Sequence, residues 1–171
     1  MNQPKLRNLS GLLVAVLALC SLAGCATQPK KQATVRSGKH MTVRTTAYTH
    51  TEKGGIKNAI GERLRFGGGG VYSAASDWSW IPLGTRFRII GDPRTYVIED
   101  YGSALVGRQT IDLYMPSRRS MNAWGVRHVE IEIVEWGSKA MSLKMLQPRT
   151  RNSHVRVMVA QLRKQGISPA G

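Results

Sequence analysis

The sequence predicts an all-β fold, a small barrel with basic flanks, and three observations support this prediction. Short segments rich in β-branched and aromatic residues alternate with turns rich in glycine, proline and aspartate. Only one short segment between these strand-like segments has the pattern of a helix, and no internal repeat is present. With 171 residues, of which 42% are hydrophobic, the chain is long enough for one compact domain with a core.

Six segments have the composition of strands. The last of them is the clearest, because Val129, Ile131 and Ile133 alternate with polar residues, as in a half-buried strand. A Gly-Asp-Pro turn at 91–93 separates the third strand from the fourth. The predicted strands are 41–48, 71–75, 86–90, 96–99, 110–114 and 127–136.

Between these strands the sequence predicts one long loop and one short helix. Residues 49–70 are expected to pass over the barrel mouth with little regular structure. Their run of four glycines lacks the Lys-Ser/Thr that follows in a phosphate-binding loop. Ser117 as N-cap and Gly125 as the stop predict a short helix between them.

After residue 138 the sequence changes character and forms a basic extension, 139–171. Residues 141–145 fit part of a helix that Pro148 ends. Residues 154–165 fit either an extra edge strand or a short basic amphipathic helix. The last five residues are predicted to be disordered.

The charge is concentrated in the flanks. The net charge is +15, and all ten acidic residues lie between Glu52 and Glu135. The predicted domain, 42–138, is therefore nearly neutral, whereas 26–41 and 139–171 carry basic residues only. Cationic flanks favour anionic partners such as phospholipid head groups or polyanionic wall polymers. The alternative is that both flanks are solvated, disordered tails.

The N-terminus has the features of a secretion signal. Lys5 and Arg7 precede an uncharged, mostly apolar run at 11–24, which is too short for a transmembrane helix. The run ends in Leu-Ala-Gly followed by Cys25, which resembles the lipobox of bacterial lipoproteins. This resemblance implies cleavage before Cys25, lipidation of its sulfur and attachment to the periplasmic face of the Gram-negative outer membrane. Residues 25–41 then form a basic tether, and nucleic acid is not an expected partner.

Three aspartates are the candidate chemical groups. Asp100 ends the fourth predicted strand, and Asp112 lies in the otherwise apolar run IDLY. Asp77 lies upstream, in a loop with Trp78 and Trp80. A carboxylate in an apolar setting is costly unless it is paired, hydrogen-bonded or protonated. Such groups either build an acid-catalysing site or, alternatively, cap turns and accept hydrogen bonds from buried amides.

Three pieces of the sequence, in order and spacing, resemble the 3D domain. This family is named for three aspartates and occurs in MltA-type lytic transglycosylases and in Gram-positive cell-wall proteins. The pieces are SAASD followed by IPLGT, EDYGSAL followed by Gly107, and IDLY followed by Trp124-Gly125. The resemblance covers roughly 42–137, and the three aspartates correspond to Asp77, Asp100 and Asp112.

The resemblance implies a six-stranded double-psi β-barrel with lytic transglycosylase activity. Such an enzyme cleaves peptidoglycan between N-acetylmuramic acid and N-acetylglucosamine and leaves a 1,6-anhydro ring. The family's acid corresponds to Asp112, with Asp100 and Asp77 as supporting carboxylates. The sequence departs from the family at Trp78, where proline is common, and at Tyr101, where threonine is common.

The resemblance also suggests where the glycan would bind. Trp78 and Trp80 fit either the core or a contact with a sugar face. No cofactor is expected, and the four histidines lack metal-ligand spacing, so no metal site is expected. The expected substrate contacts are Trp78, Trp80, Tyr101, Gly102, Ser103 and Tyr114.

Two other functions are compatible with the same sequence. A glycan-binding lipoprotein would hold peptidoglycan in the same groove without cutting it. A structural anchor would use the cationic flanks to bind anionic wall or membrane polymers. The presence of all three aspartates favours the enzyme.

Overall fold

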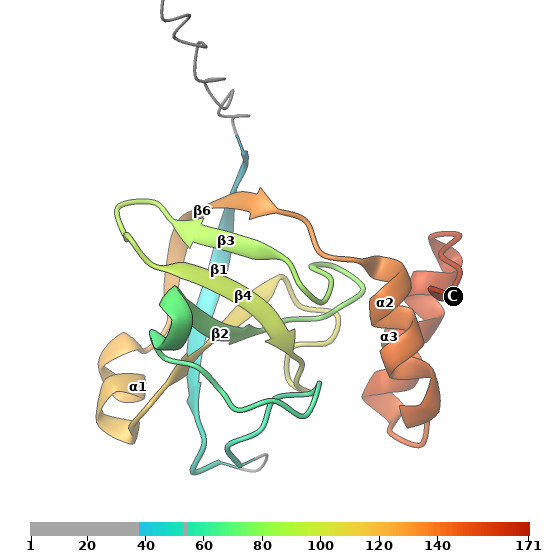
Figure 1. Cartoon of the computed structure of the whole chain (residues 1–171), viewed down its shortest axis with the longest axis horizontal. Coiled ribbons are helices and arrows are strands. Elements are labelled where there is room, and N and C mark those ends of the chain that lie inside the picture. Colours follow the sequence, from blue (N-terminus) through green and yellow to red (C-terminus); the bar gives the residue numbers. More distant parts are fainter. Residues whose placement is uncertain (1–37, 53–54) are drawn as a thin grey trace, which may run out of the picture. The chain divides into compact units, whose positions relative to one another are not determined.

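The computed structural model describes residues 38–52 and 55–171, and its six strands close into a barrel (Figure 1). Around the barrel the strands follow each other in the order β1, β5, β2, β4, β3, β6. Their bounds are β1 Lys39–Thr49, β2 Val71–Ala75, β3 Arg86–Ile89, β4 Thr95–Asp100, β5 Thr110–Met115 and β6 Arg127–Glu135. The predicted fold class, a small six-stranded double-psi β-barrel, is confirmed. The predicted signal segment and Cys25 lie outside the described residues.

The pairing of the strands is mixed. β1 runs parallel to β5 and β2 runs parallel to β4, whereas the other four neighbouring pairs are antiparallel. Because β1 begins at Lys39, the last residues of the predicted tether already belong to the barrel. The register of β2 decides the geometry of the site, since Ala75 pairs with Asp112 on one side and with Asp100 on the other.

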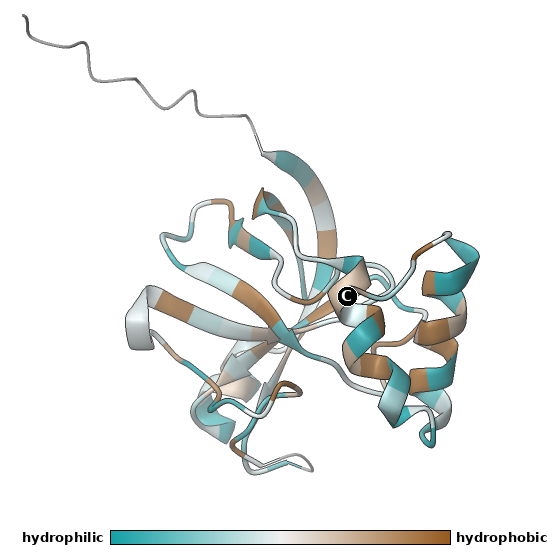
Figure 2. Cartoon of the chain, turned by 45° about the vertical axis from the view of Figure 1, so that its right-hand side comes forward, coloured by the Kyte–Doolittle hydropathy of each residue, from teal (hydrophilic) through white to brown (hydrophobic). Residues whose placement is uncertain are grey.

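Apolar side chains of all six strands fill the barrel. In β1, β3 and β6 buried residues alternate with more exposed ones, whereas β2, β4 and β5 are buried along most of their length. Figure 2 shows the resulting bands of hydrophobic and hydrophilic residues on the strands. The completely buried strand residues include Ala74, Phe87, Ile98, Ile111 and Ile131. The loop that follows β2 adds Trp78 and Ile81, which are also completely buried.

The predicted short helix is present as α1, Arg118–Trp124. Ser117 caps it, because its side chain accepts a hydrogen bond from the Ser120 N–H. Gly125 ends it with a φ of 62°, in the region that favours glycine. At the end of the helix, the Trp124 indole N–H donates to Thr45 Oγ1 of β1 at 3.3 Å, so the helix is fastened to the barrel.

The C-terminal extension is a helical pair, and the prediction of a disordered end is wrong. α2, Lys139–Leu146, is followed by the short 3₁₀ helix η2, Gln147–Arg149, and then by α3, Ser153–Lys164. Segment 154–165 is therefore helix, not an edge strand. Even the last residues have contacts, since the Ala170 N–H donates to Ala140 O and Lys144 Nζ donates to Gly171 O.

The helical spacing of buried residues explains this outcome. Val155, Met158, Val159 and Leu162 stand at helical i, i+3, i+4 and i+7 positions and are at most 5% exposed. Val155, Val157 and Val159 stand at every second position, which imitates a strand, so the sequence left both possibilities open. In the helix, Val157 is 45% exposed. None of the basic residues of 139–171 is buried, so the pair presents its charge to solvent.

The helical pair is attached to the barrel through the loop before β3. The Leu83 N–H donates to Ser142 Oγ of α2 at 2.9 Å, and Leu83 O accepts from the Ser138 N–H at 3.0 Å. A Cβ on Gly137 would lie 2.1 Å from Leu83 O, so this crossing requires glycine. Within the described residues, no helix has the length and apolar character needed to span a membrane.

Candidate active site

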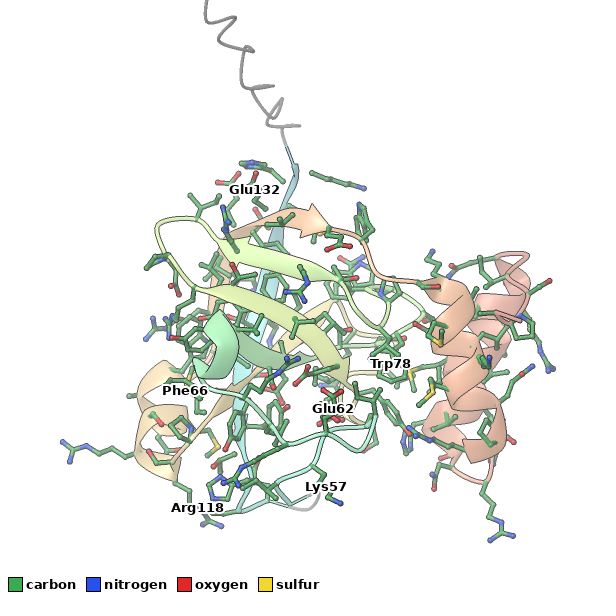
Figure 3. All side chains as sticks on the ribbon, viewed as in Figure 1. Lys57, Glu62, Phe66, Trp78, Arg118 and Glu132 are labelled. Carbon is green, nitrogen blue, oxygen red and sulfur yellow. The ribbon has the colours of Figure 1, made fainter. Side chains whose placement is uncertain are left out.

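A cavity of about 460 Å³ opens between the long loop after β1 and the loop between β4 and β5. The long loop contributes Glu52, Lys57 and Asn58 to its lining, and Figure 3 shows Lys57 on that loop. The other loop contributes a continuous segment, 101–105. Two of the three candidate aspartates, Asp100 and Asp112, line the same cavity.

The strand register places these two aspartates on either side of Ala75. Asp112 of β5 and Asp100 of β4 both pair with this residue of the strand between them. Neighbouring strands are about 4.8 Å apart, so the two aspartate backbones lie roughly 10 Å from each other. Ala74 of β2 pairs with Ile98, and the next residue, Ala75, pairs with Asp100. Glu99 is therefore the extra residue of a β-bulge. Bulges of this kind reorient side chains beside functional sites.

Asp112 has the environment of a carboxyl that holds a proton. Burial raises its pKa from 3.8 to about 6, and the charge of Glu52 adds to this rise. A hydrogen bond from Thr46 Oγ1 to Asp112 Oδ1, at 2.7 Å, and the charge of Arg44 act in the opposite direction. Oδ2 has no hydrogen bond within the described residues, so it is free to carry a proton toward a ligand. The sequence analysis named Asp100 and Asp77 as its supporting carboxylates, whereas the carboxylate whose charge raises the pKa of Asp112 is Glu52.

Asp100 is held more firmly than Asp112. Its Oδ1 accepts from the Tyr101 N–H at 2.8 Å, and its Oδ2 accepts from the Tyr48 hydroxyl at 3.4 Å. Burial raises its pKa to about 6, while the hydrogen bonds from Tyr101, Tyr48 and the Ala59 backbone act to lower it. With both oxygens used as acceptors, Asp100 is suited to stabilising positive charge and less suited to donating a proton.

Tyr48 and Thr46 are site residues that the sequence analysis missed. Tyr48 lines the cavity, and its pKa is raised by burial and by the charges of Asp100 and Asp112. The phenol therefore stays neutral and remains a donor. Both residues lie in β1, and threonine and tyrosine are common in strands whether or not they have a function. Their spacing of two residues, which places both on one face of the strand, was the only available signal.

A buried glutamate ties the long loop to the barrel. Glu99 is 2% exposed, and its carboxylate binds the Arg65 guanidinium and the Ser73 hydroxyl. The Arg65 N–H also donates to Ser73 Oγ at 2.8 Å. These contacts join the loop to β2 and β4 immediately beside Asp100, and they fix the wall of the cavity.

Asp77 does not line the cavity and acts as a connector between loops. Its Oδ1 accepts from the Ser79 N–H at 2.8 Å and from the Ser79 hydroxyl at 2.6 Å. Its Oδ2 accepts from the Gly107 N–H at 2.8 Å. Asp77 is 4% exposed, and both of its oxygens are engaged, so it joins the loop after β2 to the loop after β4.

The predicted aromatic contacts divide into core and site residues. Trp78 is completely buried on the side of the barrel that faces the helical pair (Figure 3), so it belongs to the core. Its indole N–H donates to Asp100 O at 2.9 Å, which supports the end of β4. Tyr114 is only 5% exposed, and its hydroxyl lies 3.0 Å from His50 Nδ1, outside the cavity lining.

Of the other predicted contacts, Tyr101, Gly102 and Ser103 line the cavity as expected. The ring of Tyr101 packs edge-on against Trp78, with ring centroids 5.0 Å apart. Trp80 is partly exposed and lies at a second, smaller cavity.

The raised pKa values predict a cost in stability. Because the pKa of Asp112 rises from 3.8 to about 6 on folding, the folded protein binds more protons than the unfolded chain between these pH values. The free energy of unfolding should therefore fall as pH rises through this window, by about 1–3 kcal/mol per carboxyl. Asp112→Asn should make the protein more stable than the wild type at pH 7 and equally stable at pH 4. Urea unfolding at both pH values measures this, and a variant destabilised at pH 7 would show that the carboxylate supports the fold.

Comparison with known proteins gives one match. Residues 72–135 match the family model of the 3D domain. The matched segment contains Asp77, Asp100 and Asp112, and it extends from β2 to the end of β6. β1, the long loop and the helical pair lie outside it. No curated protein matches the chain.

Proposed function

We propose that the protein is a peptidoglycan lytic transglycosylase that cleaves the bond between N-acetylmuramic acid and N-acetylglucosamine. The observation that carries the proposal is the pair Asp100 and Asp112, two carboxyls with a pKa of about 6 that line one cavity. Breaking a glycosidic bond requires a proton at the leaving oxygen and stabilisation of an oxocarbenium-like centre, and two carboxyls supply both. The match of 72–135 to the 3D domain is consistent with this chemistry.

The hydrogen bonds of the two carboxyls assign their roles in the proposed reaction. Asp112 donates the proton from its free oxygen to the glycosidic oxygen as the bond between that oxygen and muramyl C1 breaks. Asp100, ionised and held by two donors, stabilises the positive charge that develops at C1 and the ring oxygen. The muramyl C6 hydroxyl then bonds to C1 and gives its proton to the Asp112 carboxylate. This step closes the 1,6-anhydro ring and restores the acid.

This sequence of steps requires no protein nucleophile and no positioned water. The same carboxyl serves first as acid and then as base, and its pKa near 6 suits both tasks close to neutral pH. Tyr48 keeps Asp100 in place as a neutral donor throughout. The burial that raises both pKa values would become more complete once a glycan strand covers the cavity.

The direct test is digestion of purified sacculi followed by mass spectrometry of the soluble products. We expect muropeptides that end in 1,6-anhydro-N-acetylmuramic acid. We also expect their release to be highest near pH 6 and to fall on either side, because Asp112 must carry a proton while Asp100 must be ionised, and both have a pKa of about 6. Intact sacculi with bound protein would identify a glycan-binding protein instead. Products with a reducing end would indicate hydrolysis.

We further propose that the mature chain acts as a lipoprotein, lipidated at Cys25 and held at the periplasmic face of the outer membrane. The lipobox-like Leu-Ala-Gly-Cys segment supports this location, which places the enzyme beside its substrate. The exposed basic residues of the helical pair support a contribution to binding anionic wall or membrane polymers.

A further inference from the structure

A second cavity, of about 250 Å³, lies where α3 meets two loops of the barrel. One loop is the turn after β2, which contributes Trp80, and the other is the end of the β4–β5 loop, which contributes Arg108 and Gln109. The helix contributes a third wall. We call this cavity the α3 pocket.

The helical wall of the α3 pocket is a stripe beside the buried stripe of α3. Val157, Gln161 and Gln165 recur every four residues and therefore share one face of the helix. Gln165 fixes this face to the barrel, because its side-chain amide N–H donates to Ser79 O at 3.0 Å. Val157 is 45% exposed, which leaves an aliphatic surface open to the pocket.

The groups available in the α3 pocket fit an amphipathic, hydroxyl-rich ligand. Trp80 and Val157 offer apolar surface, and Arg108, Gln109 and Gln161 offer exposed side chains without hydrogen bonds to other described residues. The one carboxylate in the lining, Asp77, already accepts three hydrogen bonds. Indole with amide and guanidinium donors suits the apolar face, the hydroxyls and the acetamido group of an N-acetyl amino sugar.

The α3 pocket shares a loop with the proposed active site. Residues 101–105 line the larger cavity, and 107–109 line the α3 pocket. The Gly107 N–H is bonded to Asp77, so the second half of this loop is held in place by the turn that bears Trp80. Consecutive parts of one loop therefore line both cavities.

We propose that the α3 pocket binds one N-acetyl amino sugar of the glycan strand, at a site separate from the cleaved bond. The choice of sugar polymer rests on the proposed function. The pocket itself rests on Trp80, Val157 and Gln161, and the helix that forms half of it lies outside the segment that matches the 3D domain.

The test uses chitotetraose, a soluble oligomer of N-acetylglucosamine, and the purified ¹⁵N-labelled protein. The chain has four tryptophans, and the indole N–H signal of Trp80 is identified by its absence in Trp80→Ala. We expect this signal to shift on titration and the dissociation constant to rise roughly tenfold in Trp80→Ala. The double variant Arg108→Ala/Gln161→Ala should weaken binding as well, and because both residues are exposed it should fold normally. Trp136→Ala is the matched control, since Trp136 is 47% exposed and lies outside the α3 pocket.

The possible outcomes separate this inference from the proposed function. Two results would contradict sugar binding in the α3 pocket, even if sacculi are cleaved. One is a Trp80 signal that does not respond, and the other is equal affinity in the wild type, Trp80→Ala and the double variant. Loss of binding in both variants, with Trp136→Ala unchanged, would support the pocket even if the wild type releases no anhydro product. In that second case the enzyme proposal alone would fail.

Discussion

Asp112→Asn should reduce the release of anhydro-muropeptides by about 100- to 10,000-fold, the usual value of general acid–base help. Asparagine keeps the size of the side chain and can still accept the hydrogen bond from Thr46, but it has no proton to deliver. Asp112 lies at the cavity and its charge is disfavoured by burial, so replacing it with a neutral side chain should leave the fold intact. Product release from sacculi, measured by mass spectrometry at equal protein concentration, gives the rate.

Matched variants distinguish a lost proton donor from a disturbed site. Thr46→Val removes the hydrogen bond to Asp112 and keeps the acid, so it should alter the pH profile of cleavage and not abolish cleavage. Asp100→Asn should also impair cleavage, since it removes the charge proposed to stabilise C1, but Asp112 could still donate its proton. Binding of each variant to sacculi controls for substrate affinity. Wild-type cleavage by a folded Asp112→Asn protein would rule out Asp112 as the acid.

Most of the barrel could be predicted from the sequence, because its strands are rich in β-branched and aromatic residues and end at recognisable turns. Segment 71–75 was predicted with both correct ends, and the other five predicted strands were accurate to within two residues at either end. The capped helix between Ser117 and Gly125 was also correct. In each case the signal is local, which is why one sequence is sufficient to detect it.

The parts that depend on distant contacts could not be predicted. Thr46 and Tyr48 become site residues only because β1 pairs with β5 and closes the barrel, a pairing between segments more than 60 residues apart. Asp77 was expected beside the other aspartates, and only the positions of Ser79 and Gly107 show that its two oxygens are engaged elsewhere. Asp112 itself is only partly buried, because its apolar neighbours Ile111 and Leu113 point to the other face of β5, into the core.

The C-terminal helices show the same limitation on a larger scale. The sequence indicated a helix at 141–145 and left 154–165 open between an edge strand and a helix, and its acid-free, basic composition also fitted a solvated tail. The apolar residues at helical spacing instead find partners on the barrel, among them the completely buried Trp78 and Ile81 in the same core cluster. The helical pair therefore covers a face of the domain that bears the turn after β2, and this turn carries both Asp77 and the support for Asp100.

Leu162→Ala should reduce the free energy of unfolding by about 2–5 kcal/mol, because Leu162 of α3 is completely buried and its truncation leaves a cavity. This is a large fraction of the roughly 5–15 kcal/mol that stabilises a typical domain. Val157→Ala on the same helix is the control; Val157 is 45% exposed, so its truncation should cost no more than about 0.5 kcal/mol.

Urea unfolding, followed by circular dichroism and by tryptophan fluorescence, measures both variants. If α3 is part of the domain core, both signals should shift to lower urea together, since all four tryptophans lie outside the helical pair and the helices share a core cluster with Trp78. An unchanged midpoint in Leu162→Ala, or loss of helix well before the fluorescence changes, would mean that the helical pair is not part of the cooperative fold.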